Sequence, residues 1–93
     1  MRCLAWTIDV SEKAVKSLRK MDKQTARRIR DELNQIAELD DPRSRGKALT
    51  GGFAGLWRYR IGDYRVLCDI EDSVLVILVI EVGHRSEVYR KRG

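Results

Sequence analysis

The sequence predicts one α+β domain in which two N-terminal helices pack on one face of a mostly antiparallel four-stranded sheet, in the order β-α-α-β-β-β. Three patterns predict this fold class: an alternating N-terminal segment, two stretches with helical apolar spacing, and three strand-like segments in the second half. The 93 residues contain no internal repeat or linker. A single domain is therefore expected over 1–93, with residues 85–93 as a basic C-terminal tail.

The first strand and the first helix are expected before residue 22. Apolar residues alternate with other side chains from Cys3 to Val10, which is typical of a strand. Ser11 follows and is a favourable N-cap residue for a helix. Four apolar residues then recur with helical spacing: Ala14, Val15, Leu18 and Met21.

A second helix is expected after Asp22, which can also act as an N-cap. One apolar stripe runs along it: Ala26, Ile29, Leu33 and Ile36. The helix should end at Asp40-Asp41-Pro42, since proline disfavours helical geometry in the residue before it.

The second half is expected to hold a polar loop at 40–55 and three strands, at 56–61, 64–70 and 74–82. Gly62-Asp63 is a two-residue turn that joins the first two strands as a hairpin. The last strand is too uniformly apolar for an edge, so it is expected near the centre of the sheet, ending at Gly83.

The hairpin gathers arginines on one sheet face. The turn makes Ile61 and Tyr64 a closing pair, which sets Arg60 directly opposite Arg65 with Arg58 on the same face. Like charges that face each other across two strands are destabilising. We therefore expect this face to lie away from the helices, open to solvent, and to bind a polyanion in which phosphate carries the charge.

Composition indicates which kinds of partner the protein binds and in which cellular compartment it is expected. The chain has 19 basic and 14 acidic residues, a formal net charge of +5, which favours nucleic acid, an acidic protein or an anionic surface. Cys3 and Cys68 are too few for a zinc site or a disulfide framework, so reduced thiols are expected. No signal peptide or membrane span is recognisable, and we expect a cytoplasmic protein without a membrane partner, metal or cofactor.

Two segments carry a resemblance to a known family: Leu56-Trp-Arg-Tyr-Arg-Ile-Gly-Asp-Tyr-Arg-Val66 and Val82-Gly-His-Arg-Ser-Glu-Val-Tyr-Arg90. At this separation they resemble the RelE family of bacterial toxins, the killing half of type II toxin–antitoxin pairs. The resemblance implies a metal-independent endoribonuclease that cuts messenger RNA in the ribosomal A site and inhibits translation. It also implies neutralisation by an acidic, co-encoded RelB-like antitoxin, with operator DNA contacted only through that complex.

The resemblance also implies which residues act. The matching catalytic positions are Arg58, Arg60, Arg65, Arg85 and Tyr89. The best-known members carry lysine in place of Arg58 and Arg60, and arginine stays charged in proteins, so these two positions suit charge neutralisation better than proton abstraction. His84 is the only histidine and a secondary candidate for proton transfer. Basic residues of the loop and tail are expected to bind RNA: Arg43, Arg45, Lys47, Arg90, Lys91 and Arg92.

Two other functions stay open. A ParE-like toxin shares the fold but inhibits DNA gyrase, and it would not be expected to keep the full set of arginines and Tyr89 on one surface. A non-catalytic RNA- or protein-binding member would bind RNA in a salt-sensitive way without cleaving it.

Overall fold

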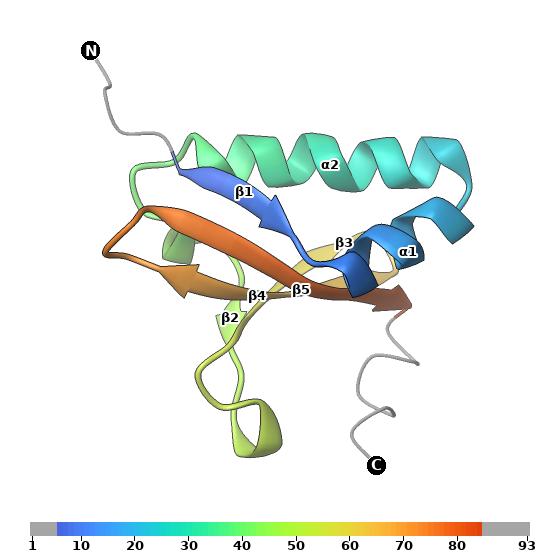
Figure 1. The fold of residues 1–93 in the computed structure, drawn as a ribbon. Coiled ribbons are helices and arrows are strands. Elements are labelled where there is room, and N and C mark those ends of the chain that lie inside the picture. Colours follow the sequence, from blue (N-terminus) through green and yellow to red (C-terminus); the bar gives the residue numbers. More distant parts are fainter. Residues whose placement is uncertain (1–5, 85–93) are drawn as a thin grey trace.

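Two helices cover one face of a five-stranded sheet in this protein (Figure 1). The structure, a computed structural model, describes residues 6–84. Its elements are β1 (Thr7–Val10), α1 (Glu12–Lys20), α2 (Lys23–Ala37), β2 (Lys47–Ala48), β3 (Trp57–Ile61), β4 (Tyr64–Glu71) and β5 (Val76–His84). Short 3₁₀ turns lie at Pro42–Ser44 and Gly51–Phe53. The predicted α+β class and the position of the helices are confirmed.

The sheet has one more strand than the sequence predicts. Its order is β1-β5-β4-β3-β2, with β1 parallel to β5 and all other neighbours antiparallel. The additional strand, β2, lies within the expected loop 40–55. Two residues are too few to show an alternation pattern, so only the pairing with β3 reveals it. The apolar β5 is an interior strand, but β4 occupies the middle of the sheet.

Two strand boundaries differ from the prediction. Within the described residues β1 begins at Thr7, since the amide of Trp6 donates to the carbonyl of Ala37 at 3.0 Å; the predicted start at Cys3 lies outside these residues. The last strand begins at Val76 and continues to His84, since the chain before it turns through Leu75, which has a positive φ of 55°. Apolar composition alone cannot distinguish such a turn from a strand.

The predicted helix starts are confirmed. The hydroxyl of Ser11 accepts a hydrogen bond from the amide of Ala14 at 3.1 Å and donates one to the carbonyl of Ile80 at 2.8 Å. It therefore caps α1 and fixes that helix to β5 at the same time. A carboxylate oxygen of Asp22 accepts from two amides at the start of α2. That helix ends at Ala37, three residues before the predicted end at Asp40.

The core fills the space between the helices and the sheet. Fully buried side chains come from α2 and from β3, β4 and β5: Ile29, Ile36, Tyr59, Val66, Cys68, Ile77 and Val79. Burying one aliphatic side chain of this size contributes roughly 1.5–3 kcal/mol. Burial also raises the pKa of the Cys68 thiol to about 12, which leaves it protonated and unreactive. Between residues 6 and 84, neither helix is long and apolar enough to cross a bilayer.

Candidate nucleic-acid interface

The β3–β4 hairpin has the predicted register. Arg60 lies directly opposite Arg65, and Ile61 lies opposite Tyr64. The short β2 adds a further cation, because Lys47 lies opposite Arg58. Directly opposed residues share a sheet face. One face therefore carries Lys47, Arg58, Arg60 and Arg65; we call it the arginine face, and it is turned away from the helices.

A hollow of about 350 Å³ opens beside the arginine face, between the loop before β2 and strand β3. Its lining residues are Arg45, Gly46, Lys47, Arg58, Tyr59 and Arg60. Two of the expected catalytic positions and two of the expected RNA-binding positions are thus brought together. The hollow is of the size that small ligands occupy, and no carboxylate is among its described lining residues. We call it the basic hollow.

Aromatic residues of β3 hold the loop that forms this hollow. The Trp57 indole Nε1 donates to the carbonyl of Arg45 at 2.6 Å, and the Tyr59 hydroxyl donates to the carbonyl of Pro42 at 2.8 Å. Burial raises the pKa of that hydroxyl, so it stays a donor. Gly46 has a φ of 83°, and a Cβ there would lie 2.5 Å from the carbonyl oxygen of Arg58. Only glycine allows so close an approach of loop and strand.

The positive charge of the site is only partly compensated. Glu32 from α2 lies 2.9 Å from a terminal nitrogen of Arg45, which leaves other N–H groups of that guanidinium available. Nε and Nη1 of Arg65 are buried and have no hydrogen-bond acceptor among residues 6–84. Buried donors of a charged group are costly to leave without an acceptor. An anion bound on this face would supply one.

The arginine face is less open than predicted. Only Arg60 of the three hairpin arginines is exposed, whereas Arg58 and Arg65 are partly buried. Leu67, which lies opposite Arg58 and outside the main core, is 1% exposed. Glu81 continues this row on β5 and lies 3.5 Å from Lys13 of α1. The aliphatic parts of these arginine side chains therefore pack on a partly apolar surface, which reduces the screening of their charges by water.

Arg43 is engaged elsewhere. Its two terminal nitrogens each donate to one carboxylate oxygen of Asp72 at 2.9 Å, and one of them also donates to the carbonyl of Ile70 at 3.4 Å. This hydrogen bonding lowers the pKa of Asp72. Arg43 ties the loop to the β4–β5 turn and does not line the basic hollow. Its guanidinium is therefore engaged in an ion pair within the protein, and its contact with RNA stays a prediction.

His84 is not brought together with the hairpin arginines. It lies opposite Tyr64, with ring centroids 5.7 Å apart and an interplanar angle of 82°, whereas the Arg60–Arg65 row continues to Gly83. An irregularity in the β4–β5 register leaves Ile80 as an extra residue, and this reverses the faces of the residues after it. The other expected positions lie outside the described residues: Arg85, Tyr89, Arg90, Lys91 and Arg92.

Sequence reasoning missed three residues that shape the site. Glu32 pairs with Arg45, while Trp57 and Tyr59 hold the loop. One signal was available, because buried tryptophan and tyrosine usually direct their polar atom to a partner. The partner itself, a carbonyl 12 or 17 residues away, could not be identified from the pattern.

The fold is that of a known class of toxin. Residues 8–89 match the family described as the ParE toxin of the type II toxin–antitoxin system parDE. Because this match covers most of the chain, the protein belongs to this family, within the RelE/ParE superfamily of type II toxins. The resemblance to RelE toxins is confirmed by the relatives and solved structures that follow.

The sequence identities to individual relatives are modest. Over 51 residues the chain is 35% identical to the toxin RelG of Mycobacterium tuberculosis, a match that covers 55% of this chain and only 59% of RelG. The RelBE2 toxin–antitoxin complex of M. tuberculosis aligns with a TM-score of 0.81 at 23% identity, over 92% of this chain and 98% of that chain. The isolated RelE toxin of E. coli aligns with a TM-score of 0.70 at 26% identity, over 95% of both chains.

Proposed function

We propose that the protein is a ribosome-dependent endoribonuclease that cuts messenger RNA in the A site, inhibits translation, and is neutralised by a RelB-like antitoxin. The observation that carries this proposal is the Arg60–Arg65 pair, with buried nitrogens of Arg65 that have no acceptor among the described residues. The facing pair is unfavourable in the free protein and becomes favourable when a phosphate lies between the guanidiniums.

The proposed reaction is attack of the substrate's own 2′-hydroxyl on the adjacent phosphorus. The P–O5′ bond breaks, which leaves a 2′,3′-cyclic phosphate and a free 5′-hydroxyl. Negative charge builds up on the non-bridging oxygens, and the guanidiniums of Arg60 and Arg65 stabilise it. One such donor is typically worth roughly 3–4 kcal/mol.

The basic hollow would hold a neighbouring part of the same RNA strand. Arg58 and Arg60 are two residues apart on β3, so they lie on the same face at roughly 7 Å. That separation is comparable with the distance between successive phosphates of a nucleic-acid strand. Arg45 and Lys47 would then neutralise the phosphate next to the one that is cut.

Proton transfer needs groups other than Arg58 and Arg60, because an arginine stays charged. Arg85 and Tyr89 remain the proposed leaving-group and base-contacting residues. His84 faces the helix side, so it stays a secondary candidate that would have to act from the end of β5.

An acidic partner fits the same toxin class. Several of the similar solved structures are complexes of a RelE toxin with its RelB antitoxin, including those of M. tuberculosis and E. coli. We propose that an acidic protein encoded beside this chain binds it tightly, and that the complex, rather than the toxin alone, contacts operator DNA.

Primer extension on a message translated with and without the protein tests the proposal. Breaks at regular positions within codons are expected with the wild-type protein and only when ribosomes are present. Uniform breaks on naked RNA, or none at all while translation continues, would count against it.

One observation favours a second function. The family whose description matches residues 8–89 is named for ParE toxins, and a ParE-like protein would inhibit DNA gyrase. Measuring supercoiling and protein synthesis in the same induced culture separates the two, since the first process to stop identifies the target. A non-catalytic member would stop neither while still binding RNA.

A further inference from the structure

The proposed reaction needs a group that accepts the proton of the 2′-hydroxyl. Arg58, Arg60 and Arg65 cannot accept it, because a guanidinium has no acceptor atom and stays charged in proteins. His84 has an acceptor nitrogen, but it lies opposite Tyr64 on the helix side of the sheet. An acceptor among the described residues therefore has to be a different side chain that reaches the arginine face.

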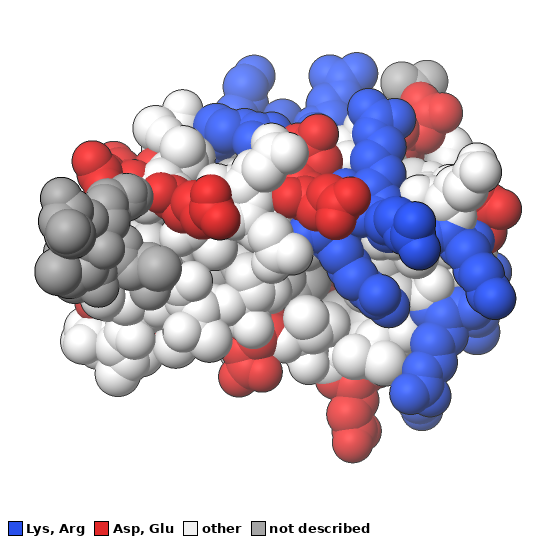
Figure 2. Space-filling view, turned by 90° about the horizontal axis from the view of Figure 1, so that it is seen from above, with Lys and Arg blue, Asp and Glu red and all other residues white. Residues whose placement is uncertain are grey.

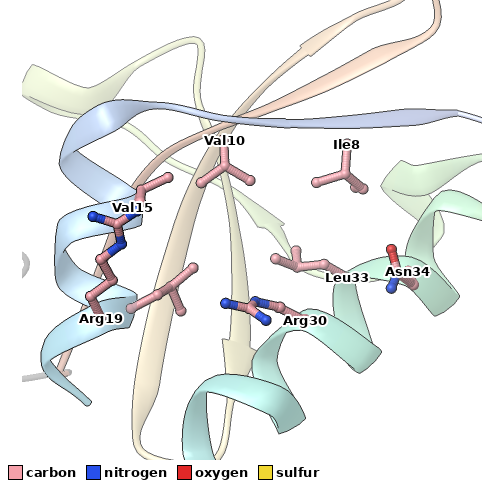
Figure 3. A pocket seen from close by; sticks show the side chains of 8 residues that line it. Ile8, Val10, Val15, Arg19, Arg30, Leu33 and Asn34 are labelled. Atoms are coloured by element: carbon pink, nitrogen blue, oxygen red, sulfur yellow. The ribbon is translucent and has the colours of Figure 1, made fainter. Parts of the chain in front are cut away.

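The helix side of the protein does not provide this group. Figure 2, which views that side, shows Asp and Glu side chains among Lys and Arg over the helices, which the core separates from the arginine face. Glu32 of α2 is bound to Arg45, next to the β2 edge of the sheet. The hollow of about 360 Å³ between β1, α1 and α2 is lined by aliphatic side chains, Arg19, Arg30 and Asn34 (Figure 3). None of these described lining residues is a proton acceptor.

A carboxylate, that of Glu81, lies on the arginine face beside the proposed phosphate site. It is opposite Leu67, which is opposite Arg58, so it belongs to the row that begins with Lys47 on β2. Its side chain is only 12% exposed, so water screens its charge little. The described strands carry the other carboxylates of this face further from Arg65: Asp9, Asp69 and Glu71.

Glu81 is the diagonal neighbour of Arg65 across β4 and β5. Arg65 lies directly opposite Gly83, and Glu81 is two residues before that glycine. Diagonal neighbours lie roughly 7–8 Å apart, which is within reach of long side chains. Because Gly83 has no side chain, β5 itself places nothing directly opposite Arg65. A substrate phosphate can therefore approach this guanidinium beside Glu81.

The carboxylate of Glu81 and the guanidinium of Arg65 form no ion pair with each other. Nε and Nη1 of Arg65 have no acceptor among residues 6–84, whereas Glu81 lies 3.5 Å from Nζ of Lys13, a side chain that is 57% exposed. One such contact uses only part of the acceptor capacity of a carboxylate, which has about four lone-pair sites. Arg65 thus keeps donors for a phosphate, while Glu81 keeps lone pairs for a neighbouring hydroxyl.

Given the proposed function, on which this inference rests, we propose that Glu81 is the general base of the reaction. As the 2′-oxygen attacks the phosphorus, its proton passes to the carboxylate of Glu81 while Arg60 and Arg65 hold the phosphate. The O2′–P bond forms, the P–O5′ bond breaks, and the departing O5′ takes up a proton from water. Glu81 then returns its proton to water, so the protein ends as it began.

A carboxylate beside a phosphate site has a recognisable effect on binding and on rate. It repels the negatively charged substrate, so it weakens binding while it speeds the reaction. A residue that only holds α1 to β5 through Lys13 would act through the ion pair alone. Removal of the charge of Glu81 should therefore separate binding from cleavage, whereas removal of the charge of Lys13 should not.

Three substitutions distinguish these roles. Glu81→Gln keeps the size of the side chain but cannot accept the proton. Glu71→Gln is the matched control, since it makes the same change on the same face, six residues from Arg65 along β4. Lys13→Gln breaks the ion pair and leaves the carboxylate in place. Each full-length protein is mixed with ribosomes that hold a message, and single-turnover cleavage and binding to the ribosome are both measured.

Glu81→Gln should cleave at least about 10²-fold more slowly than the wild type, because a general base typically contributes 10²–10⁴-fold. It should bind the ribosome with its message as tightly as the wild type, or more tightly. Glu71→Gln and Lys13→Gln should stay within about threefold of the wild-type rate. Glu81→Asp keeps a carboxylate and should cleave at least roughly tenfold faster than Glu81→Gln. Circular dichroism checks that each variant folds.

A folded Glu81→Gln variant that cleaves at the wild-type rate would overturn the inference. So would an equal loss in Lys13→Gln, because the ion pair would then be the cause. A message with sulfur in place of O5′ at the cleavage site adds a chemical check, since a thiolate leaves without being protonated. This message should not restore cleavage by Glu81→Gln; restoration would make Glu81 an acid and not a base.

Failure of the nuclease proposal would look different. A wild-type protein that cuts no ribosome-bound message would contradict the proposed function and the role of Glu81 together. A wild-type protein that cuts the message, with a Glu81→Gln variant that cuts it equally fast, would contradict only the role of Glu81.

Discussion

The Nε1 of Trp57 donates a 2.6 Å hydrogen bond to the carbonyl oxygen of Arg45, so the strand that carries the arginines also holds the loop beside them. The ring of Trp57 packs against the core while its one polar atom reaches the loop. The basic hollow thus depends on a side chain whose apolar surface belongs to the opposite side of the sheet.

Trp57→Phe should loosen this loop. The substitution keeps an aromatic ring but removes the N–H, so the free energy of unfolding should fall by about 1 kcal/mol and the affinity for a short single-stranded RNA should fall with it. Denaturant unfolding and fluorescence anisotropy measure the two effects. Tyr64→Phe is the control, because the Tyr64 hydroxyl makes no hydrogen bond within the described chain; matching losses in the control would refute the role of the indole.

Gly46→Ala should be costly. The residue has a positive φ, and its new Cβ would lie 2.5 Å from the carbonyl oxygen of Arg58. Gly51→Ala is a matched control, since Gly51 also has a positive φ but open space around it. The control should lose roughly 1–2 kcal/mol from backbone strain alone, and Gly46→Ala should lose about 1–3 kcal/mol more from the contact. Equal losses in thermal unfolding would mean that the loop can move away without penalty.

Arg60→Glu should stabilise the fold and abolish function. Replacing a like-charge pair with an opposite-charge pair across β3 and β4 should add roughly 0.2–1 kcal/mol to the free energy of unfolding. The same change places a carboxylate where we propose that phosphate binds. Single-turnover cleavage of ribosome-bound message should fall by at least about 10²-fold. If the variant is more stable but still cleaves at the wild-type rate, Arg60 does not take part in cleavage.

Arg65→Ala should lower cleavage by about 10²–10³-fold, because it removes a cation from the reacting phosphate. Arg28→Ala, an exposed arginine on α2, is the control and should cleave normally. Retention of activity by Arg65→Ala would show that its buried nitrogens do not serve the substrate.

The Arg43–Asp72 pair should make stability depend on pH. The bond lowers the folded-state pKa of Asp72, so its stabilising effect is fully present above the ordinary aspartate pKa and is lost as pH falls through the lower folded value. Wild type should be more stable than Asp72→Asn at neutral pH, and the difference should shrink below roughly pH 4. Thermal unfolding of both proteins across this range measures it.

The parts of the fold that the sequence predicts are those set by local chemistry. Ser11 and Asp22 cap their helices through their own side chains, and Gly62-Asp63 fixes the hairpin register and hence the Arg60–Arg65 pair. Each of these relationships spans only a few residues, so composition and spacing are enough.

The parts that the sequence does not predict depend on distant pairing. Lys47 joins the arginine face only because a two-residue strand pairs with β3. If residues alternated regularly after Ile77 and Val79, His84 would lie on the arginine face. The extra residue Ile80 shifts the alternation by one, so His84 lies on the helix side instead. Neither feature has a signal in the residues themselves.

The hydrogen bonds from Trp57 and Tyr59 mean that the basic hollow is formed by the loop and the strand together. Residues 42–48 grafted into another protein would bring the basic side chains but would not form the basic hollow, unless residues equivalent to Trp57 and Tyr59 were grafted as well. Substitution of Trp57 or Tyr59 is therefore limited in two ways: the ring has to pack against the core, and its polar atom has to donate to a loop carbonyl.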